Sequence, residues 1–136
     1  MGKNPETLYI CRGNVGRSQM AQAFHNSLSG SGAISAGLDV AEQKEGEGLA
    51  KEVYECMQEE GYSMEGHYRK QVTLKMIQQA DKVVVITSPA DFEKYAELAK
   101  QVLYWDIPDA KGTDLEYHRL VRDSVESHVR ELLGHD

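Results

Sequence analysis

Residues 7–28 read TLYICRGNVGRSQMAQAFHNSL, and they decide the fold because three kinds of segment follow one another in them. Thr7–Ile10 is a short apolar run that ends at Cys11, which is typical of a buried strand. Residues 13–17 include two glycines, and Ser18–Leu28 is a run of good helix formers with regularly placed apolar residues. This stretch therefore predicts a strand, a loop and a helix.

The same alternation continues along the chain. Residues 82–87, KVVVIT, form a β-branched run that is consistent with a strand buried on both faces. Such an alternation predicts an open parallel sheet with right-handed crossovers and helices on both faces. Ligands bind at the carboxyl ends of the strands in these sheets, where Cys11 is expected to lie. The other expected strands are Ala33–Gly37 and Val102–Trp105, and the other expected helices are Leu49–Glu60, Leu74–Ala80, Pro89–Lys100 and Leu115–Leu133.

Composition restricts the classes of function. The chain has 136 residues, a net charge of −7 and two cysteines. We find no repeat or linker and predict one domain, residues 1–136. The acidic balance argues against nucleic acid and anionic membranes as partners, and no stretch has the apolar length of a membrane span or a signal peptide. The cysteines and histidines lack metal-ligand spacing, so we expect a cytoplasmic protein without a metal.

The chemistry is concentrated in CRGNVGRS, residues 11–18. Its two glycines let the backbone curl so that successive N–H groups point at one anion, and the following helix adds the positive end of its dipole. The same field stabilises a thiolate, which makes Cys11 a candidate nucleophile. Arg17 can clamp two phosphoryl oxygens through its planar guanidinium group. The remaining candidate phosphate-binding residues are Arg12, Gly13, Asn14, Val15, Gly16 and Ser18, of which Ser18 can also donate a hydrogen bond to the thiolate.

A purely structural interpretation competes with this one. A cysteine at the end of a strand usually packs as a small apolar residue. The motif, however, falls between a predicted strand and a predicted helix, contains two glycines and lies where this fold class binds ligands. That context favours an anion-binding loop.

The loop CRGNVGRS resembles that of the low-molecular-weight protein tyrosine phosphatases and the related thioredoxin-coupled arsenate reductases, whose shared pattern is C-x-G-N-x-x-R-S. The resemblance implies a three-layer sandwich with a four-stranded parallel sheet, a phosphocysteine intermediate and no metal or organic cofactor. It also implies that the stretch Asp106–Asp109 supplies a catalytic aspartate and that His67 bonds Asn14 and braces the loop, with a histidine on a surface loop as the equal alternative for His67. Further similar stretches are Ser35–Gly37, Gly61–His67, Ala80–Ile86 and Asp106–Asp109, so the resemblance covers nearly the whole chain.

The sequence departs from the family pattern in ways that bear on function. Gly16 replaces the second loop cysteine, which excludes a disulfide within the loop. Ala110 follows Asp109 where proline is usual, so we predict Asp109 as the general acid and keep Asp106 as the alternative. Residues 111–113, KGT, replace the paired tyrosines of phosphotyrosine-specific members. No cysteine follows Ile86, which argues against the arsenate reductase branch.

The sequence therefore predicts a cysteine-dependent phosphatase. Its expected substrate is a phosphorylated protein or a small phosphate ester, with phosphotyrosine, phosphoarginine and small esters all open, and phosphate and arsenate are expected to bind as oxyanions. An arsenate reductase that uses an external thiol and a non-catalytic phosphate-binding module are the alternatives. Arg12 is expected at the rim, Trp105 either at the pocket mouth or in packing, and Cys56 in the core.

Overall fold

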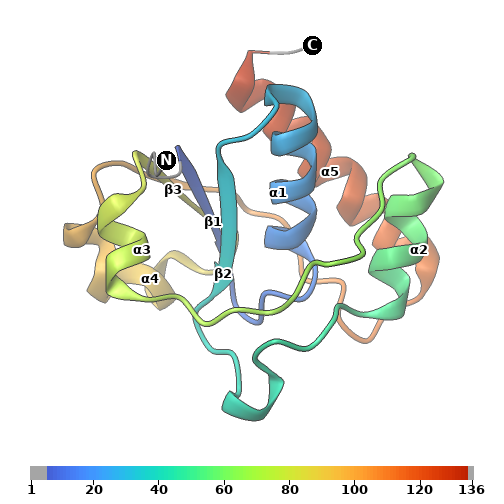
Figure 1. Cartoon of the computed structure of the whole chain (residues 1–136), viewed down its shortest axis with the longest axis horizontal. Helices are drawn as coiled ribbons and strands as arrows, with labels where there is room; N and C mark the ends of the chain where they lie inside the picture. Colours follow the sequence, from blue (N-terminus) through green and yellow to red (C-terminus); the bar gives the residue numbers. More distant parts are fainter. Residues whose placement is uncertain (1–5, 135–136) are drawn as a thin grey trace.

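A four-stranded parallel sheet in the order β2-β1-β3-β4 forms the centre of the structure, a computed structural model that describes residues 6–134 (Figure 1). The strands are β1 (Thr7–Cys11), β2 (Ala33–Gly37), β3 (Lys82–Val85) and β4 (Val102–Tyr104). The helices are α1 (Arg17–Ser29), α2 (Lys51–Glu59), α3 (Leu74–Gln79), α4 (Pro89–Phe92) and α5 (Leu115–Leu133), with the 3₁₀ turns η1 (Glu42–Lys44) and η2 (Glu93–Leu98).

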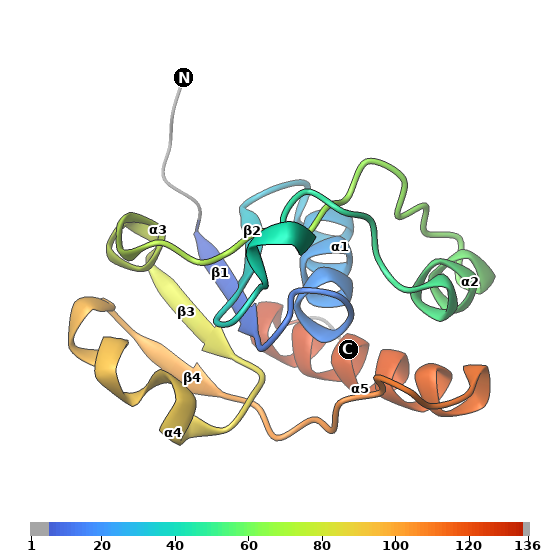
Figure 2. The same cartoon turned by 90° about the horizontal axis from the view of Figure 1, so that it is seen from below.

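Helices cover both faces of the sheet, which confirms the predicted three-layer α/β sandwich (Figure 2). Alternate residues of β1 and β3 belong to different cores, because successive side chains of a strand point to opposite faces. Tyr9 and Val84 lie opposite each other on neighbouring strands and pack in the core beneath α1 and α5. Helix α2 packs against α5. Leu8 and Val83 pack in the other core, beneath α3, α4 and η2.

The expected bounds of most elements match the structure to within one or two residues at each end, and the largest difference concerns residues 89–100. The helix predicted over residues 89–100 is α4 for four residues and then the 3₁₀ turn η2. Phe92 is the only residue of α4 and η2 that is fully buried, so this segment has little apolar face to hold a regular α-helix. The strand predicted over residues 82–87 ends at Val85.

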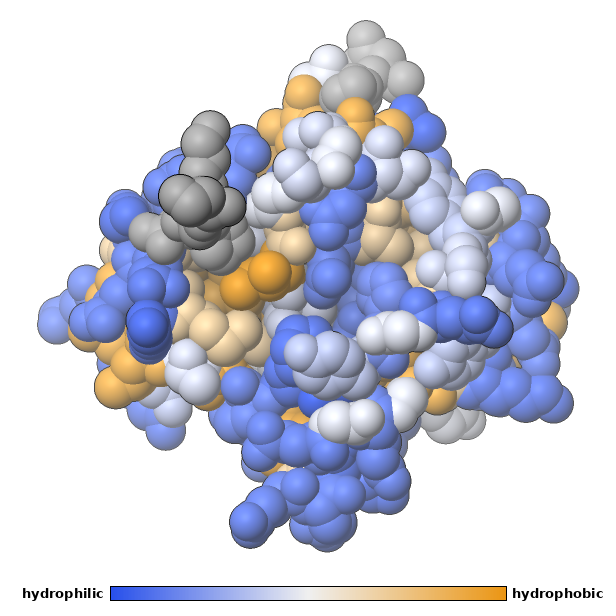
Figure 3. Space-filling model, in the orientation of Figure 1, coloured by the Kyte–Doolittle hydropathy of each residue, from blue (hydrophilic) through white to orange (hydrophobic). Residues whose placement is uncertain are grey.

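The arrangement of the strands fixes where a ligand can bind. β1 pairs with β2 on one side and with β3 on the other. After β1 the chain first adds a strand on one side of it and then crosses over to add strands on its other side. A crevice therefore forms at the carboxyl end of β1, which is where sheets of this kind bind ligands. Cys11 is the last residue of β1. Figure 3 shows a mainly hydrophilic surface in this view, with a small apolar area between α3 and β2. Within residues 6–134, no helix combines the length and the apolar character that crossing a bilayer requires.

Candidate active site

The loop between β1 and α1 presents free backbone donors. Gly16 is the N-cap of α1, and no side chain caps this end of the helix. Within the described part of the chain, none of the N–H groups of residues 13–18 donates a hydrogen bond to a protein acceptor. Free N–H groups at the start of a 13-residue helix form a site suited to an anion. The predicted anion-binding loop therefore has the free backbone N–H donors that it requires.

A chain of hydrogen bonds leads to the Cys11 sulfur. Asn14 Nδ2 donates to Ser18 Oγ over 2.8 Å, and Ser18 Oγ lies 2.9 Å from Cys11 Sγ. Because the Ser18 oxygen accepts from Asn14, its own hydrogen is free to point at the sulfur. A thiolate can only accept, so this arrangement suits a deprotonated Cys11, which is 3% exposed.

Asn14 holds the shape of the loop. Its backbone is left-handed, with φ 55°, a conformation that asparagine tolerates better than most residues. The side chain is fully buried, and its oxygen accepts from the Lys70 N–H and from Gln19 Nε2, each over 2.9 Å. Its Nδ2 group also donates to Ser35 Oγ over 3.1 Å. Bonds from α1, β2 and the segment after α2 thus meet at one side chain.

His67 does not bond Asn14, so the resemblance misplaced this contact. His67 Nδ1 lies 3.1 Å from Gln19 Oε1, and Gln19 in turn bonds Asn14. The Gln19 oxygen can only accept, so His67 donates from Nδ1. Burial, with the nearby positive charge of Lys70, lowers the pKa of His67 and keeps its ring neutral near pH 7. His67 therefore braces the loop through Gln19, a buried residue that the sequence analysis did not single out.

Gly37, at the end of β2, lies directly against the loop. A Cβ atom there would come within 2.8 Å of the Arg12 carbonyl oxygen, 3.0 Å of the Asn14 backbone nitrogen and 2.6 Å of Val40 Cγ2. Two of these three atoms belong to the backbone, so they cannot move aside as a flexible side chain would. The loop and β2 fit together only because residue 37 has no side chain.

We expect Gly37→Ala to lower the free energy of unfolding by about 1–3 kcal/mol and to weaken phosphate binding, because the new methyl group displaces the loop backbone. Denaturant unfolding and phosphate titration measure the two effects. Ala36→Gly is the matched control: it costs roughly 0.5–1 kcal/mol of stability without intruding on the loop. Equal phosphate affinity in both variants would contradict the expectation.

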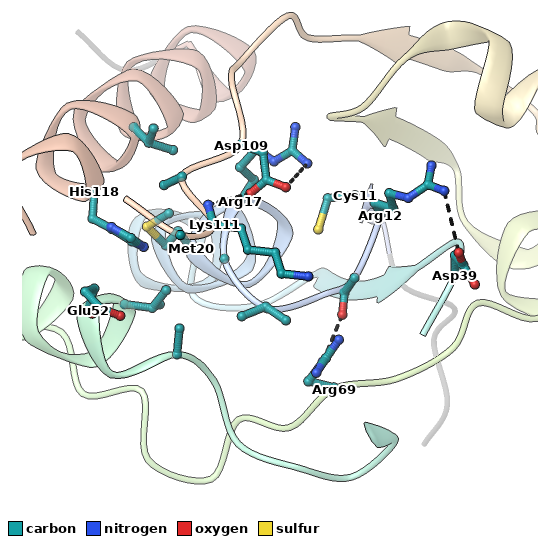
Figure 4. Close-up of a pocket in the computed structure, with 18 residues that line it drawn as sticks. Cys11, Arg12, Arg17, Met20, Asp39, Glu52, Arg69, Asp109, Lys111 and His118 are labelled. Atoms are coloured by element: carbon teal, nitrogen blue, oxygen red, sulfur yellow. Dashed lines mark hydrogen bonds and ion pairs between the residues drawn. The ribbon is translucent and has the colours of Figure 1, made fainter. Parts of the chain in front are cut away.

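A pocket of about 320 Å³ opens above the loop and brings together the residues expected to be catalytic (Figure 4). Cys11, Arg17 and Asp109 all line it. Arg17 is nearly buried; its Nη1 donates to the Ile107 carbonyl over 2.9 Å and its Nη2 lies 3.6 Å from Asp109 Oδ2. The arginine thus ties the phosphate loop to residues 106–113, which we call the acid loop.

Asp106 and Trp105 lie outside this pocket. Both line a neighbouring depression behind Arg17. The Trp105 ring packs 5.7 Å from the Tyr9 ring and 5.1 Å from the His128 ring, measured between centroids. Of the two interpretations that the sequence left open for Trp105, the structure shows packing. Of the two aspartates, only Asp109 faces Cys11 across the pocket.

Charged side chains surround the mouth. Arg12 is exposed at the rim, as expected, with its guanidinium 3.6 Å from Asp39 and 3.5 Å from Asp91. Two further cations line the pocket that the sequence analysis did not assign to the site, Arg69 and Lys111. Arg69 Nε donates to the Gly13 carbonyl over 3.0 Å.

Neither the second cysteine nor a metal cluster belongs to this site. Cys56 is fully buried in α2, its Sγ 3.6 Å from the Val53 carbonyl, and burial raises its pKa. Within residues 6–134, one group of acidic side chains could hold an ion: Glu60, Asp123 and Glu126. None of the three lines the pocket, and arginines already pair with Asp123 and Glu126.

Comparison with sequence models of protein families identifies the family of this chain. The sequence model described as low molecular weight phosphotyrosine protein phosphatase matches residues 6–135. The chain belongs to this family. Members with curated names include arsenate reductase 2 of Staphylococcus saprophyticus, 28% identical over 93% of this chain and 95% of that protein, and arsenate reductase 1 of Staphylococcus epidermidis, 30% identical over 91% and 92%.

Solved structures with the same fold include proteins described as phosphatases. The arginine phosphatase YwlE of Geobacillus stearothermophilus is 26% identical, with a TM-score of 0.84 over 94% of this chain and 90% of that one. Vibrio vulnificus Wzb, solved with benzylphosphonate, shares the fold at 20% identity, with a TM-score of 0.84 over 98% and 99%. The curated relatives of this chain are thus named as arsenate reductases, whereas a structural neighbour at 26% identity is named as an arginine phosphatase.

The two cysteines of this family member should differ in reactivity. We expect iodoacetamide to modify Cys11 at least ~10-fold faster than Cys56 at neutral pH, because Cys11 lines the pocket beside free N–H donors whereas burial disfavours the Cys56 thiolate. Inorganic phosphate should slow only the reaction at Cys11. Peptide mass spectrometry over time measures both rates, and an absence of phosphate protection would argue against an anion site at the loop.

Proposed function

We propose that this protein hydrolyses phosphomonoesters through a phosphocysteine on Cys11. The proposal rests on the position of the Cys11 sulfur. It is hydrogen-bonded to the Ser18 hydroxyl and lines the pocket that Arg17 and Asp109 also line. A nucleophile, an anion clamp and an acid within one small pocket are the groups that such a reaction needs. The substrate is a phosphorylated protein or a small phosphate ester.

In the first step the Cys11 thiolate attacks phosphorus while the bond to the ester oxygen breaks. Arg17 and the free N–H groups of the loop hold the non-reacting oxygens. Asp109 gives its proton to the departing alkoxide, so that a neutral alcohol leaves. Asp109 is half-exposed at the pocket, where it can exchange that proton with water.

In the second step Asp109, now a carboxylate, takes a proton from water as the water attacks the phosphocysteine. The sulfur–phosphorus bond breaks, phosphate leaves, and the thiolate returns to its hydrogen bond with Ser18. Each cycle consumes one water and releases one alcohol and one phosphate. The chain's own groups supply every proton transfer.

Arsenate reduction is a second candidate, which the named curated relatives support. Reducing arsenate to arsenite takes two electrons, and two thiols supply them as they join in a disulfide. Cys56 is buried away from the pocket, so in this chain the second thiol would come from an external donor such as glutathione. The same loop would hold arsenate in place of phosphate.

Two assays on the purified protein separate the candidates. Turnover of 4-nitrophenyl phosphate in the presence of a metal chelator is the result that we expect. A protein that binds phosphate without turnover would instead be a binding module. Arsenite that forms in proportion to added glutathione, faster than the phosphate ester is hydrolysed, would favour the reductase.

A further inference from the structure

Two cations on one side of the pocket have no acidic partner. Arg69 reaches Gly13 from the segment after α2, and Lys111 extends from the acid loop with its ammonium group pointing into the pocket, on the side of Cys11 and Arg69 (Figure 4). In the described part of the chain, neither the Arg69 guanidinium nor the Lys111 ammonium lies within 4.0 Å of a carboxylate oxygen, whereas the guanidinium groups of Arg12 and Arg17 do. The protein as a whole carries a charge of −7, so this positive region is a local exception.

Three carboxylates line the same pocket, and two of them already pair with other arginines: Asp39 with Arg12 and Asp109 with Arg17. Glu52 lines the same pocket from α2, but Figure 4 places it beside His118, at the far side from Arg69. Arg69 and Lys111 therefore keep their positive charges unpaired among the described residues, and Arg69 adjoins the loop that receives the phosphoryl group.

The walls of the pocket do not suit an aromatic group. Among the described residues, no phenylalanine, tyrosine or tryptophan lines it. The one aromatic ring among the described lining residues is the His118 imidazole, at the far side beside Glu52, so an aryl ester held near Arg69 would gain little beyond ordinary apolar contact. A short aliphatic chain gains the same contact. The apolar lining residues are Val15, Met20, Ala50, Val53, Ala110 and Val121.

We propose that Arg69 and Lys111 form a second anion subsite beside the phosphate loop, and that the substrate is a small aliphatic phosphate monoester with a second anionic group. This rests on the proposed phosphomonoesterase function. A pocket of about 320 Å³ is at the small end for ligand sites, so both anionic groups lie within a few bonds of each other. The acidic neighbours of a phosphorylated residue in a protein would reach the rim at Arg12 instead.

Binding of phosphonates tests the subsite without any need for turnover. Calorimetry compares ethyl-, propyl- and butylphosphonate with phosphonoacetate, 3-phosphonopropionate and 4-phosphonobutyrate. Each pair differs only in a terminal carboxylate. We expect the carboxylate to tighten binding about tenfold at the best chain length, as one charge-assisted hydrogen bond in a pocket would.

Substitutions locate the effect. Lys111→Met should remove most of the preference for the carboxylate, and Lys111→Glu should reverse it. Lys111 is exposed and its ammonium makes no ion pair among the described residues, so neither change endangers folding. Arg69→Met should reduce the preference as well. Lys75→Met, on the exposed side of α3, alters the net charge equally and should leave the preference intact.

Turnover of small phosphate esters gives a second, independent test of the subsite. We expect 3-phosphoglycerate to exceed glycerol 3-phosphate in kcat/KM about tenfold, since only the former has a carboxylate. Equal binding within every phosphonate pair, or a preference that survives in the Lys111 and Arg69 variants, would overturn the subsite. Faster turnover of acidic phosphoserine peptides than of either small ester would overturn the small substrate. Phosphonates that bind as expected without turnover of any ester would leave the subsite standing and refute the proposed function.

Discussion

Cys11→Ser should lower kcat for 4-nitrophenyl phosphate by at least ~10⁴-fold, the largest effect of any single change in this chain. A serine hydroxyl stays protonated near neutral pH, and the structure supplies no base for it. The Cys11 sulfur has Ser18 as its side-chain hydrogen-bond partner within residues 6–134, and Ser18 is positioned to donate. Serine is close to cysteine in size, so the fold and phosphate binding should persist.

Cys56→Ala is the matched control for this experiment. It removes the other thiol, which lies in the core formed with α2 and α5 and not in the pocket. It should cost stability through the lost sulfur contacts while kcat stays near the wild-type value. Rapid quenching in alkali, where a phosphocysteine survives, should trap a labelled Cys11 peptide in wild type and in Cys56→Ala after mixing with ³²P-labelled substrate. Turnover in Cys11→Ser, or label on another residue, would refute the phosphocysteine route.

Asp109→Asn should lower kcat/KM, which reports the first step and not the later attack of water, by roughly 10²- to 10⁴-fold for phenyl phosphate and far less for 4-nitrophenyl phosphate. A phenolate is basic and needs a proton as it leaves, whereas nitrophenolate leaves readily without one. Asparagine can keep the hydrogen bond that Asp109 Oδ1 accepts from the Lys111 N–H, so the acid loop should hold its shape. The pH profile of kcat should lose the limb that belongs to the acid.

Asp106→Asn provides the comparison within the same loop. Asp106 faces the depression behind Arg17 and not the sulfur, so its loss should act equally on both esters. The Arg17–Asp109 ion pair is also lost in Asp109→Asn, and that loss too should be independent of the leaving group. A leaving-group dependence confined to Asp106→Asn would make Asp106 the acid.

The sequence predicted the sheet and the position of the phosphate loop because both depend on local patterns. Apolar runs mark β1 and β3, and the spacing of Gly13, Gly16 and Arg17 marks the loop and the start of α1. The signals for β1, the loop and the start of α1 lie within about a dozen residues of one another. The parallel pairing follows from the alternation of strands and helices, whereas the order β2-β1-β3-β4 was not predicted.

The supports of the loop could not be predicted in the same way, because they join segments far apart in the chain. The Arg69 bond to Gly13 and the Lys70 bond to Asn14 each span 56 residues. No local pattern marks Arg69. Gln19 did carry a signal, since a glutamine directly after the motif in an apolar helix is buried only if its amide has partners, and one such partner is His67.

The four bonds around Asn14 have a consequence for the entropy of binding. A loop that became ordered only around its ligand would lose about 1–2 kcal/mol of backbone freedom for each residue fixed, at the expense of affinity. Here Ser18, Ser35, Gln19 and the Lys70 N–H already hold Asn14 from several sides. That ordering is completed when the chain folds. The attraction between the loop and a phosphoryl group then remains available to stabilise the transition state instead of shaping the site.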